Sequence, residues 1–182
     1  MIRYFTIFAL LLVAGCQYNP FAHRFLTKEP TSEEVIGEYQ LKEVYVDMVD
    51  PNLGDRIRAA KPTPTITLHR DGNATLVNFP FFEELDRTFD YNFKGLENLD
   101  ARWEISMVGS VSSGGNHSKK VYGILLTLTD GRSLFDSPSL TGKNSVDGMI
   151  FTLYDGDQGQ ILGYTKTKAE QGGAANPAKP DG

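Results

Sequence analysis

Apolar and polar residues alternate with a period of two over much of the chain between residues 35 and 167. The clearest example runs from Ala101 to Val108, where Trp103, Ile105 and Met107 share one face. Successive side chains of a β-strand point to opposite faces, so the pattern predicts strands with one buried face and places Trp103 in the core. The predicted strands are Val35–Met48, Ile66–Leu68, Ala74–Phe79, Ala101–Val108, Val121–Thr129, Met149–Tyr154 and Gln160–Lys166.

Turn residues separate these strands at short intervals. Asp71-Gly72-Asn73 predicts a tight turn, and the run from Tyr154 to Gly159 predicts a hairpin loop. Short strands joined by such turns indicate an all-β antiparallel meander, either closed into a barrel or folded as a sandwich.

The stretch from Phe79 to Leu99 interrupts the alternation. It contains five phenylalanines and one short piece compatible with a helix, Phe82 to Arg87. Two interpretations remain open: a lid or plug at one end of a barrel, or a long connection whose aromatic side chains fill the core.

The first fifteen residues have the order of an export signal. Arg3 supplies a basic start, and an apolar run from Tyr4 to Ala14 is too short to span a membrane. Val13-Ala14-Gly15-Cys16 then resembles the lipobox of bacterial lipoproteins, and Cys16 is the single cysteine of the chain. The resemblance implies cleavage after Gly15 and attachment of acyl chains, palmitate among them, to Cys16, which would anchor the protein to a bilayer.

The same signal predicts the organisation and the location of the chain. Residues 1–15 form the signal peptide, 16–34 a lipidated tether, 35–167 the β-barrel domain and 168–182 a disordered tail rich in Gly, Ala and Pro. Gln17 follows the cysteine, where an Asp commonly retains a Gram-negative lipoprotein in the inner membrane. In a Gram-negative host we therefore expect the outer membrane, with the domain facing the periplasm.

Charge excludes some partners. The signal segment holds one basic residue and no acidic one, so the formal net charge of −5 becomes −6 after its removal. An acidic balance argues against nucleic-acid binding and against general attraction to an anionic membrane surface.

Few residues suggest chemistry. The three histidines, His23, His69 and His117, lack the spacing of metal ligands, and no Gly-x-Ser-x-Gly motif is present. Asp155 and Asp157 resemble the start of a calcium loop, but Lys166 stands where an EF-hand needs Glu. We therefore predict no catalytic residues, no metal and no cofactor. The loop from Ser110 to Lys120 is either a recognition loop or a connection without function.

The order of short motifs resembles uncharacterised proteobacterial lipocalin-like lipoproteins. These motifs are Val35-Ile36-Gly37-Glu38-Tyr39, Asp71-Gly72, Asn78-Phe79-Pro80, Ala101-Arg102-Trp103, Tyr154-Asp155-Gly156-Asp157, Tyr164 and Lys166. The resemblance implies an antiparallel lipocalin-like barrel or half-open barrel, and it implies no reaction.

These observations predict a non-catalytic, membrane-anchored envelope lipoprotein. Its barrel would bind a small apolar ligand or serve as a docking module. Two alternatives remain: a lipoprotein that holds a protein partner, of the inhibitor or immunity type, and a hydrolase that uses His69 or His117. Because aromatic side chains are abundant, we expect a filled barrel, with any ligand in a shallow pocket near Phe79 to Phe93.

Overall fold

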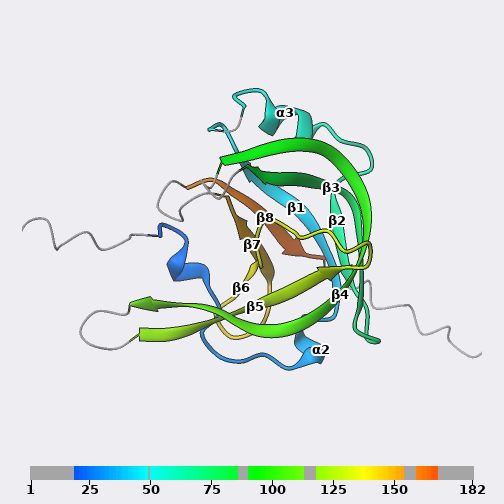
Figure 1. Cartoon of the computed structure of the whole chain (residues 1–182). Coiled ribbons are helices and arrows are strands. Elements are labelled where there is room, and N and C mark those ends of the chain that lie inside the picture. Colours follow the sequence, from blue (N-terminus) through cyan, green and yellow to red (C-terminus); the bar gives the residue numbers. More distant parts are fainter. Residues whose placement is uncertain (1–18, 49, 86–89, 113–117, 154–158, 168–182) are drawn as a thin grey trace, which may run out of the picture.

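Eight antiparallel strands follow one another in chain order and close into a barrel (Figure 1). The computed structural model describes residues 19–48, 50–85, 90–112, 118–153 and 159–167. The strands are β1 (Gly37–Tyr45), β2 (Thr65–Leu68), β3 (Asn73–Leu85), β4 (Asp90–Ser112), β5 (Ser118–Leu128), β6 (Ser139–Thr141), β7 (Gly148–Thr152) and β8 (Ile161–Lys166). The predicted all-β meander is confirmed, and β1 pairs with β8 to complete the barrel.

Strands β3 and β4 are much longer than the sequence pattern predicted. Their pairing continues from Asn73↔Arg102 to Leu85↔Asp90, so the stretch from Phe79 to Leu99 belongs largely to one hairpin. The predictions of a separate lid or plug, and of a helix beginning at Phe82, are wrong for the described residues. The alternation is hidden because the register shifts twice, between Leu76 and Phe79 and between Phe81 and Phe82.

Asn78 forms the first of these irregularities. Its φ of 50° lies in the left-handed region, which Asn tolerates better than most residues. The Asn78 amide N–H donates to Asn98 Oδ1 at 2.9 Å, and Asn78 Nδ2 donates to the Pro62 carbonyl at 2.7 Å. These bonds satisfy the backbone and side chain where the strand bends.

Two short helices flank β1, and neither was predicted. Helix α2 (Ser32–Val35) precedes the strand and starts with a capping box between Thr31 and Glu34. Helix α3 (Leu53–Arg58) follows the strand, and Leu53 and Ile57, four residues apart, are both fully buried. Figure 1 places α3 and α2 at opposite ends of the barrel.

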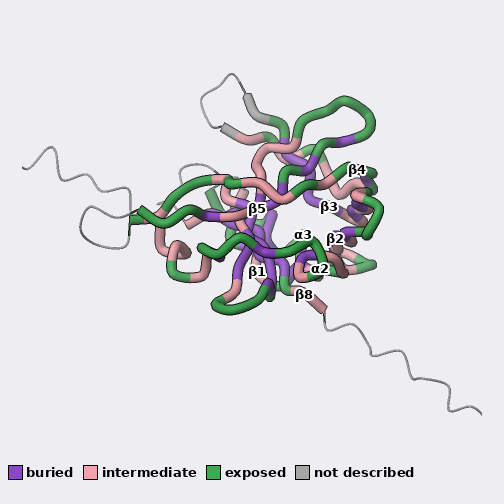
Figure 2. The backbone as a smooth tube through the Cα atoms, turned by 90° about the horizontal axis from the view of Figure 1, so that it is seen from below, coloured by how far each residue is buried: buried purple, intermediate pink, exposed green. Residues whose placement is uncertain are grey.

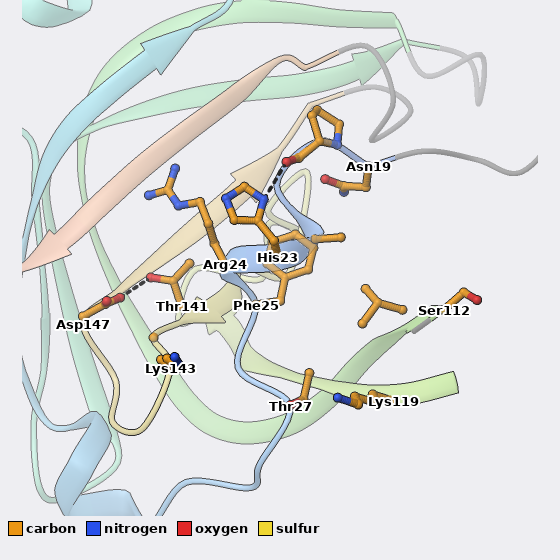
Figure 3. Close-up of a pocket in the computed structure, with 14 residues that line it drawn as sticks. Asn19, His23, Arg24, Phe25, Thr27, Ser112, Lys119, Thr141, Lys143 and Asp147 are labelled. Carbon is orange, nitrogen blue, oxygen red and sulfur yellow. Dashed lines mark hydrogen bonds between the residues drawn. The ribbon is translucent and has the colours of Figure 1, made fainter. Parts of the chain in front are cut away.

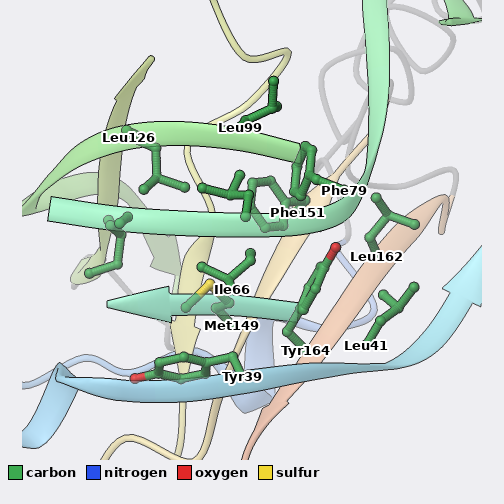
Figure 4. Packing of buried hydrophobic residues seen from close by; sticks show 14 of the residues in the cluster. Tyr39, Leu41, Ile66, Phe79, Leu99, Leu126, Met149, Phe151, Leu162 and Tyr164 are labelled. Carbon is green, nitrogen blue, oxygen red and sulfur yellow. The ribbon is translucent and has the colours of Figure 1, made fainter. Parts of the chain in front are cut away.

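The interior is packed with the barrel's own side chains. Phe79 of β3, Phe151 of β7 and Tyr164 of β8 contact one another, with ring centroids 5.3 to 6.3 Å apart (Figure 4). Phe135, from the loop before β6, packs against Phe79 and Phe151. Buried segments gather in the centre of the barrel, and exposed ones lie at its ends and hairpins (Figure 2).

Trp103 departs from its predicted place in the core. It packs against the core cluster but remains only partly buried, and its Nε1 donates to the His69 carbonyl at 2.9 Å. The period-two pattern predicted the correct face of the strand, because Ala101, two residues earlier on the same face, is buried. The pattern carries no information on how close a position lies to the end of the barrel.

The segment predicted as a tether takes part in the barrel. Strands β5 and β6 pair only at Gly123↔Ser139 among the described residues. Beside this pair, the Leu26 amide donates to the Leu140 carbonyl at 2.8 Å, and the Leu26 carbonyl accepts from the Tyr122 amide at 3.1 Å. The Leu26 side chain is buried. Part of the segment predicted as a tether, at Phe25 and Leu26, is therefore joined to the barrel.

Gly123 allows the Pro138 carbonyl to lie close to β5. A Cβ at this position would lie 2.3 Å from the Pro138 carbonyl oxygen and 2.7 Å from the Val108 side chain.

In the described part of the chain, no helix has the length and apolar character needed to cross a bilayer.

Candidate functional site

A groove of about 790 Å³ opens beside the N-terminal segment (Figure 3). We call it the N-terminal groove. Its walls are the short helix η1 (Ala22–Arg24) with its flanking residues, the ends of β4 and β5, and the β6–β7 connection. Its lining residues are Asn19, Pro20, Ala22, His23, Arg24, Phe25, Thr27, Val111, Ser112, Lys119, Thr141, Gly142, Lys143 and Asp147.

Backbone hydrogen bonds hold the N-terminal wall of the groove against the barrel. Phe25 forms an isolated antiparallel bridge with Thr141, and the Gly142 amide donates to the Arg24 carbonyl at 3.1 Å. His23 Nδ1 lies 3.0 Å from the Pro20 carbonyl, which can only accept, so this nitrogen carries the proton in the contact. The wall is thus fixed to β6 before any ligand arrives.

Arg24 and Glu43 form the best-defined ion pair at this end of the barrel. Both guanidinium NH groups donate to the carboxylate, at 2.8 and 2.7 Å, and about a third of each side chain is exposed. The hydrogen bonds from Arg24 hold the pKa of Glu43 below its usual range. This bidentate pair ties η1 to β1 and leaves the Arg24 charge largely compensated.

Lys119 of β5 and Lys143 of the β6–β7 connection are the remaining cations of the groove. Both are exposed, and neither forms an ion pair with a described residue. The groove's carboxylate, Asp147, accepts a hydrogen bond from Thr141 Oγ1 at 2.6 Å. The groove therefore offers two lysines outside any ion pair with a described residue and one acidic side chain, Asp147, on a chain whose overall charge is negative.

A second pocket, of about 470 Å³, lies on the barrel surface beside the β2–β3 turn. Its lining includes Asp71, Trp103 and Leu125. The Asn73 backbone and side-chain N–H groups donate to the Asp71 carboxylate and lower its pKa. Asp71 thus serves the turn, and the pocket offers a shallow polar surface.

His69, a candidate of the hydrolase alternative, lies close to this pocket. Its Nε2 is 3.2 Å from Thr75 Oγ1 on the neighbouring strand. This is a histidine–hydroxyl pair, but His69 is exposed, Thr75 is only partly buried, and no carboxylate hydrogen-bonds the ring among the described residues. A nucleophile with a positioned base needs that third group.

Asp136 is an acidic group that the sequence analysis missed. Oδ1 and Oδ2 accept hydrogen bonds from the Ser137 and Thr152 amides, at 2.7 and 2.8 Å. Burial raises the pKa of Asp136 from 3.8 to about 6, despite these two bonds. Because both oxygens are engaged by backbone amides, the carboxylate fixes the loop before β6 to the end of β7. The run Asp136-Ser137-Pro138, typical of a turn, was the available signal in the sequence.

Several residues singled out from the sequence lie outside the described residues. They are Cys16, His117, Asp155 and Asp157, together with the signal peptide 1–15 and the tail 168–182. His23 and His69 lie at different sites. His23 lines the N-terminal groove, and His69 contacts Thr75. In the part of the chain that the structure describes, no group of three or more His, Cys, Asp or Glu could hold a metal ion.

Both pockets lie away from the stretch between Phe79 and Phe93, where a shallow ligand site was predicted. There Phe82 contacts Phe93 and Phe135, and Arg56 of α3 lies 5.5 Å from the centroid of the Phe93 ring. These aromatic side chains pack on one another and on α3. Of the two pockets described above, the N-terminal groove is the larger.

Comparison with known proteins adds no relative to this description. No protein-family model matches the chain, and no curated protein or solved structure is significantly similar to it.

Proposed function

We propose that this chain is a non-catalytic lipoprotein of the bacterial cell envelope, anchored through acyl chains on Cys16. Its barrel would act as a docking module for another envelope protein rather than as a carrier of an apolar ligand. The observation that favours docking over carriage is the aromatic packing of the barrel interior, where Phe79, Phe151 and Tyr164 contact one another across the barrel.

A carrier of the lipocalin type needs an interior space for its ligand. The positions that would line such a space, Ile124, Leu126, Met149 and Phe151, are all buried and belong to one hydrophobic cluster. Phe135 adds a further ring from the loop before β6. Because these packed side chains fill the barrel interior, recognition would take place on the outer surface and the loops.

The N-terminal segment supports the anchoring part of the proposal. It is joined to β5 and β6 through Leu26, and to β1 through the Arg24–Glu43 pair. An acyl group on Cys16 would therefore hold the barrel itself close to the bilayer. A long flexible linker would instead leave the domain free to reorient.

The anchoring test uses expression with labelled palmitate in a Gram-negative host. We expect the wild-type chain to carry label in the outer membrane and Cys16→Ser to carry none. Gln17→Asp is the matched control, because it should keep the label while moving the protein to the inner membrane. Equal label in wild type and Cys16→Ser would contradict the proposal.

The docking test uses the acylated protein extracted with a mild detergent. We expect a protein partner that stays bound at a fixed molar ratio through gel filtration and native mass spectrometry. A stoichiometric apolar small molecule retained inside the protein would contradict docking and support the carrier. The hydrolase alternative requires a histidine, so it predicts an activity that is lost in a His69→Ala, His117→Ala double variant.

A further inference from the structure

The N-terminal groove lies very close in the chain to the proposed anchor. Asn19 lines the groove and is three residues after Cys16. An extended chain covers at most about 3.6 Å per residue, so Asn19 lies within about 11 Å of the acylated residue. Any membrane that holds Cys16 is therefore within reach of the groove.

Two lysines of this groove form no ion pair with a described residue and can contact an external anion. Lys119 and Lys143 line it from β5 and from the β6–β7 connection (Figure 3). Arg24 is already engaged by Glu43, and Asp147 accepts a hydrogen bond from Thr141. Thr27 and Ser112 add hydroxyl groups to the lining.

We propose that the N-terminal groove binds the phosphate headgroup of an anionic phospholipid in the membrane that carries the acyl anchor, with Lys119 and Lys143 as its cationic contacts. This inference rests on the proposed lipid anchor. It assigns a ligand class to a groove of about 790 Å³, a volume in the range of small-molecule sites.

Electrostatics selects this face of the protein for the contact. The chain as a whole carries a formal net charge of −5, which an anionic surface repels. The Debye length is about 8 Å at physiological salt, so the two lysines attract an anionic headgroup only where the anchor brings the groove close to the bilayer. The groove would therefore fix the orientation of the barrel on the membrane.

Lysine reactivity in reconstituted vesicles tests the inference with the acylated protein. The protein is inserted into phosphatidylcholine vesicles with or without phosphatidylglycerol, and amine acetylation is followed by mass spectrometry. We expect phosphatidylglycerol to slow acetylation of Lys119 and Lys143 about fivefold, the factor expected for one cation near an anionic surface. Lys61 is the internal control, because it is exposed and lies outside the groove.

High salt and a soluble phosphate ester distinguish binding of a membrane headgroup from other causes of protection. Raising the salt from about 0.1 M to about 1 M shortens the Debye length from about 10 Å to about 3 Å and should abolish the protection. Equal acetylation with and without phosphatidylglycerol overturns the inference, as does protection of Lys61 to the same degree. Protection by soluble glycerol phosphate in vesicles without phosphatidylglycerol also overturns it, since the groove would then bind a free phosphate ester.

The failure of the anchor gives a different result. A chain without acyl groups has a lower mass and does not stay with the vesicles, so that outcome contradicts the proposed function itself. An acylated, vesicle-bound chain with unprotected lysines contradicts only the headgroup site.

Discussion

Tyr164→Phe should make this protein more stable. The Tyr164 ring lies in the aromatic centre of the barrel, and its hydroxyl is buried without a hydrogen-bond partner among the described residues. Burial raises the pKa of this phenol well above its usual range. A buried hydroxyl without a partner has lost its hydrogen bonds to water and gained none in return.

The magnitude follows from two opposing effects. Removing an unpaired buried polar group relieves about 1–3 kcal/mol, and the small void left by the oxygen atom offsets part of this gain. We expect Tyr164→Phe to raise the free energy of unfolding by about 1 kcal/mol, which corresponds to about 3 °C in melting temperature for a domain of this size.

Tyr39→Phe is the matched control. Tyr39 is also fully buried in the barrel, but its hydroxyl donates a hydrogen bond to the Val35 carbonyl at the end of α2. The same substitution there removes a satisfied bond and leaves the carbonyl without its donor, so it should cost about 1–2 kcal/mol.

Urea unfolding of the chain that begins at Gln17, followed by tryptophan fluorescence, measures both variants. The expected result is a midpoint that rises for Tyr164→Phe and falls for Tyr39→Phe, with unchanged slopes. If Tyr164→Phe destabilised the protein as much as Tyr39→Phe, the hydroxyl would have a partner and the reasoning would be refuted.

Three further predictions concern the contacts that hold the loops and the N-terminal segment. Since burial raises the pKa of Asp136 to about 6, protonation stabilises the folded state below about pH 4, and this contribution is lost as the pH rises through 6. The unfolding free energy of wild type relative to Asp136→Asn should therefore fall by about 3 kcal/mol between about pH 4 and pH 7 in urea titrations, and a constant difference would contradict the shift. Arg24→Gln should raise the pKa of Glu43 toward its ordinary value in carboxyl NMR titrations and cost about 1 kcal/mol, because the pair is only partly exposed; an unchanged Glu43 titration would show that the ion pair is absent in solution. Leu26→Ala should cost about 2–4 kcal/mol in thermal unfolding and speed proteolysis before Ser32, whereas a neutral effect would mean that the segment is not part of the barrel.

Much of the barrel could be predicted from local pattern, and the errors have identifiable causes. Strands with one buried face, such as Ala101 to Val108, were found because their alternation is regular. The extensions of β3 and β4 were missed where two register shifts break the period. Strand β6 has three residues, too few for a period to show. The capping box at Thr31 and Glu34 was the signal for α2 that the sequence carried.

The sequence by itself determined the strand-rich class and the antiparallel order, and the prediction of an export signal and of lipidation at Cys16 rests on it alone. Each depends on residues close together in the chain: alternation within a strand, a turn between two strands, or a short box before a cysteine. The tertiary structure decided that Phe25 and Leu26 pair with the barrel at β5 and β6, that Trp103 lies near its edge, and that Lys119 and Lys143 line one groove. These facts depend on contacts between residues distant in the chain, which local patterns do not encode. The net charge of −5 could be counted from the sequence, whereas the placement of Lys119 and Lys143 in one groove was set by folding.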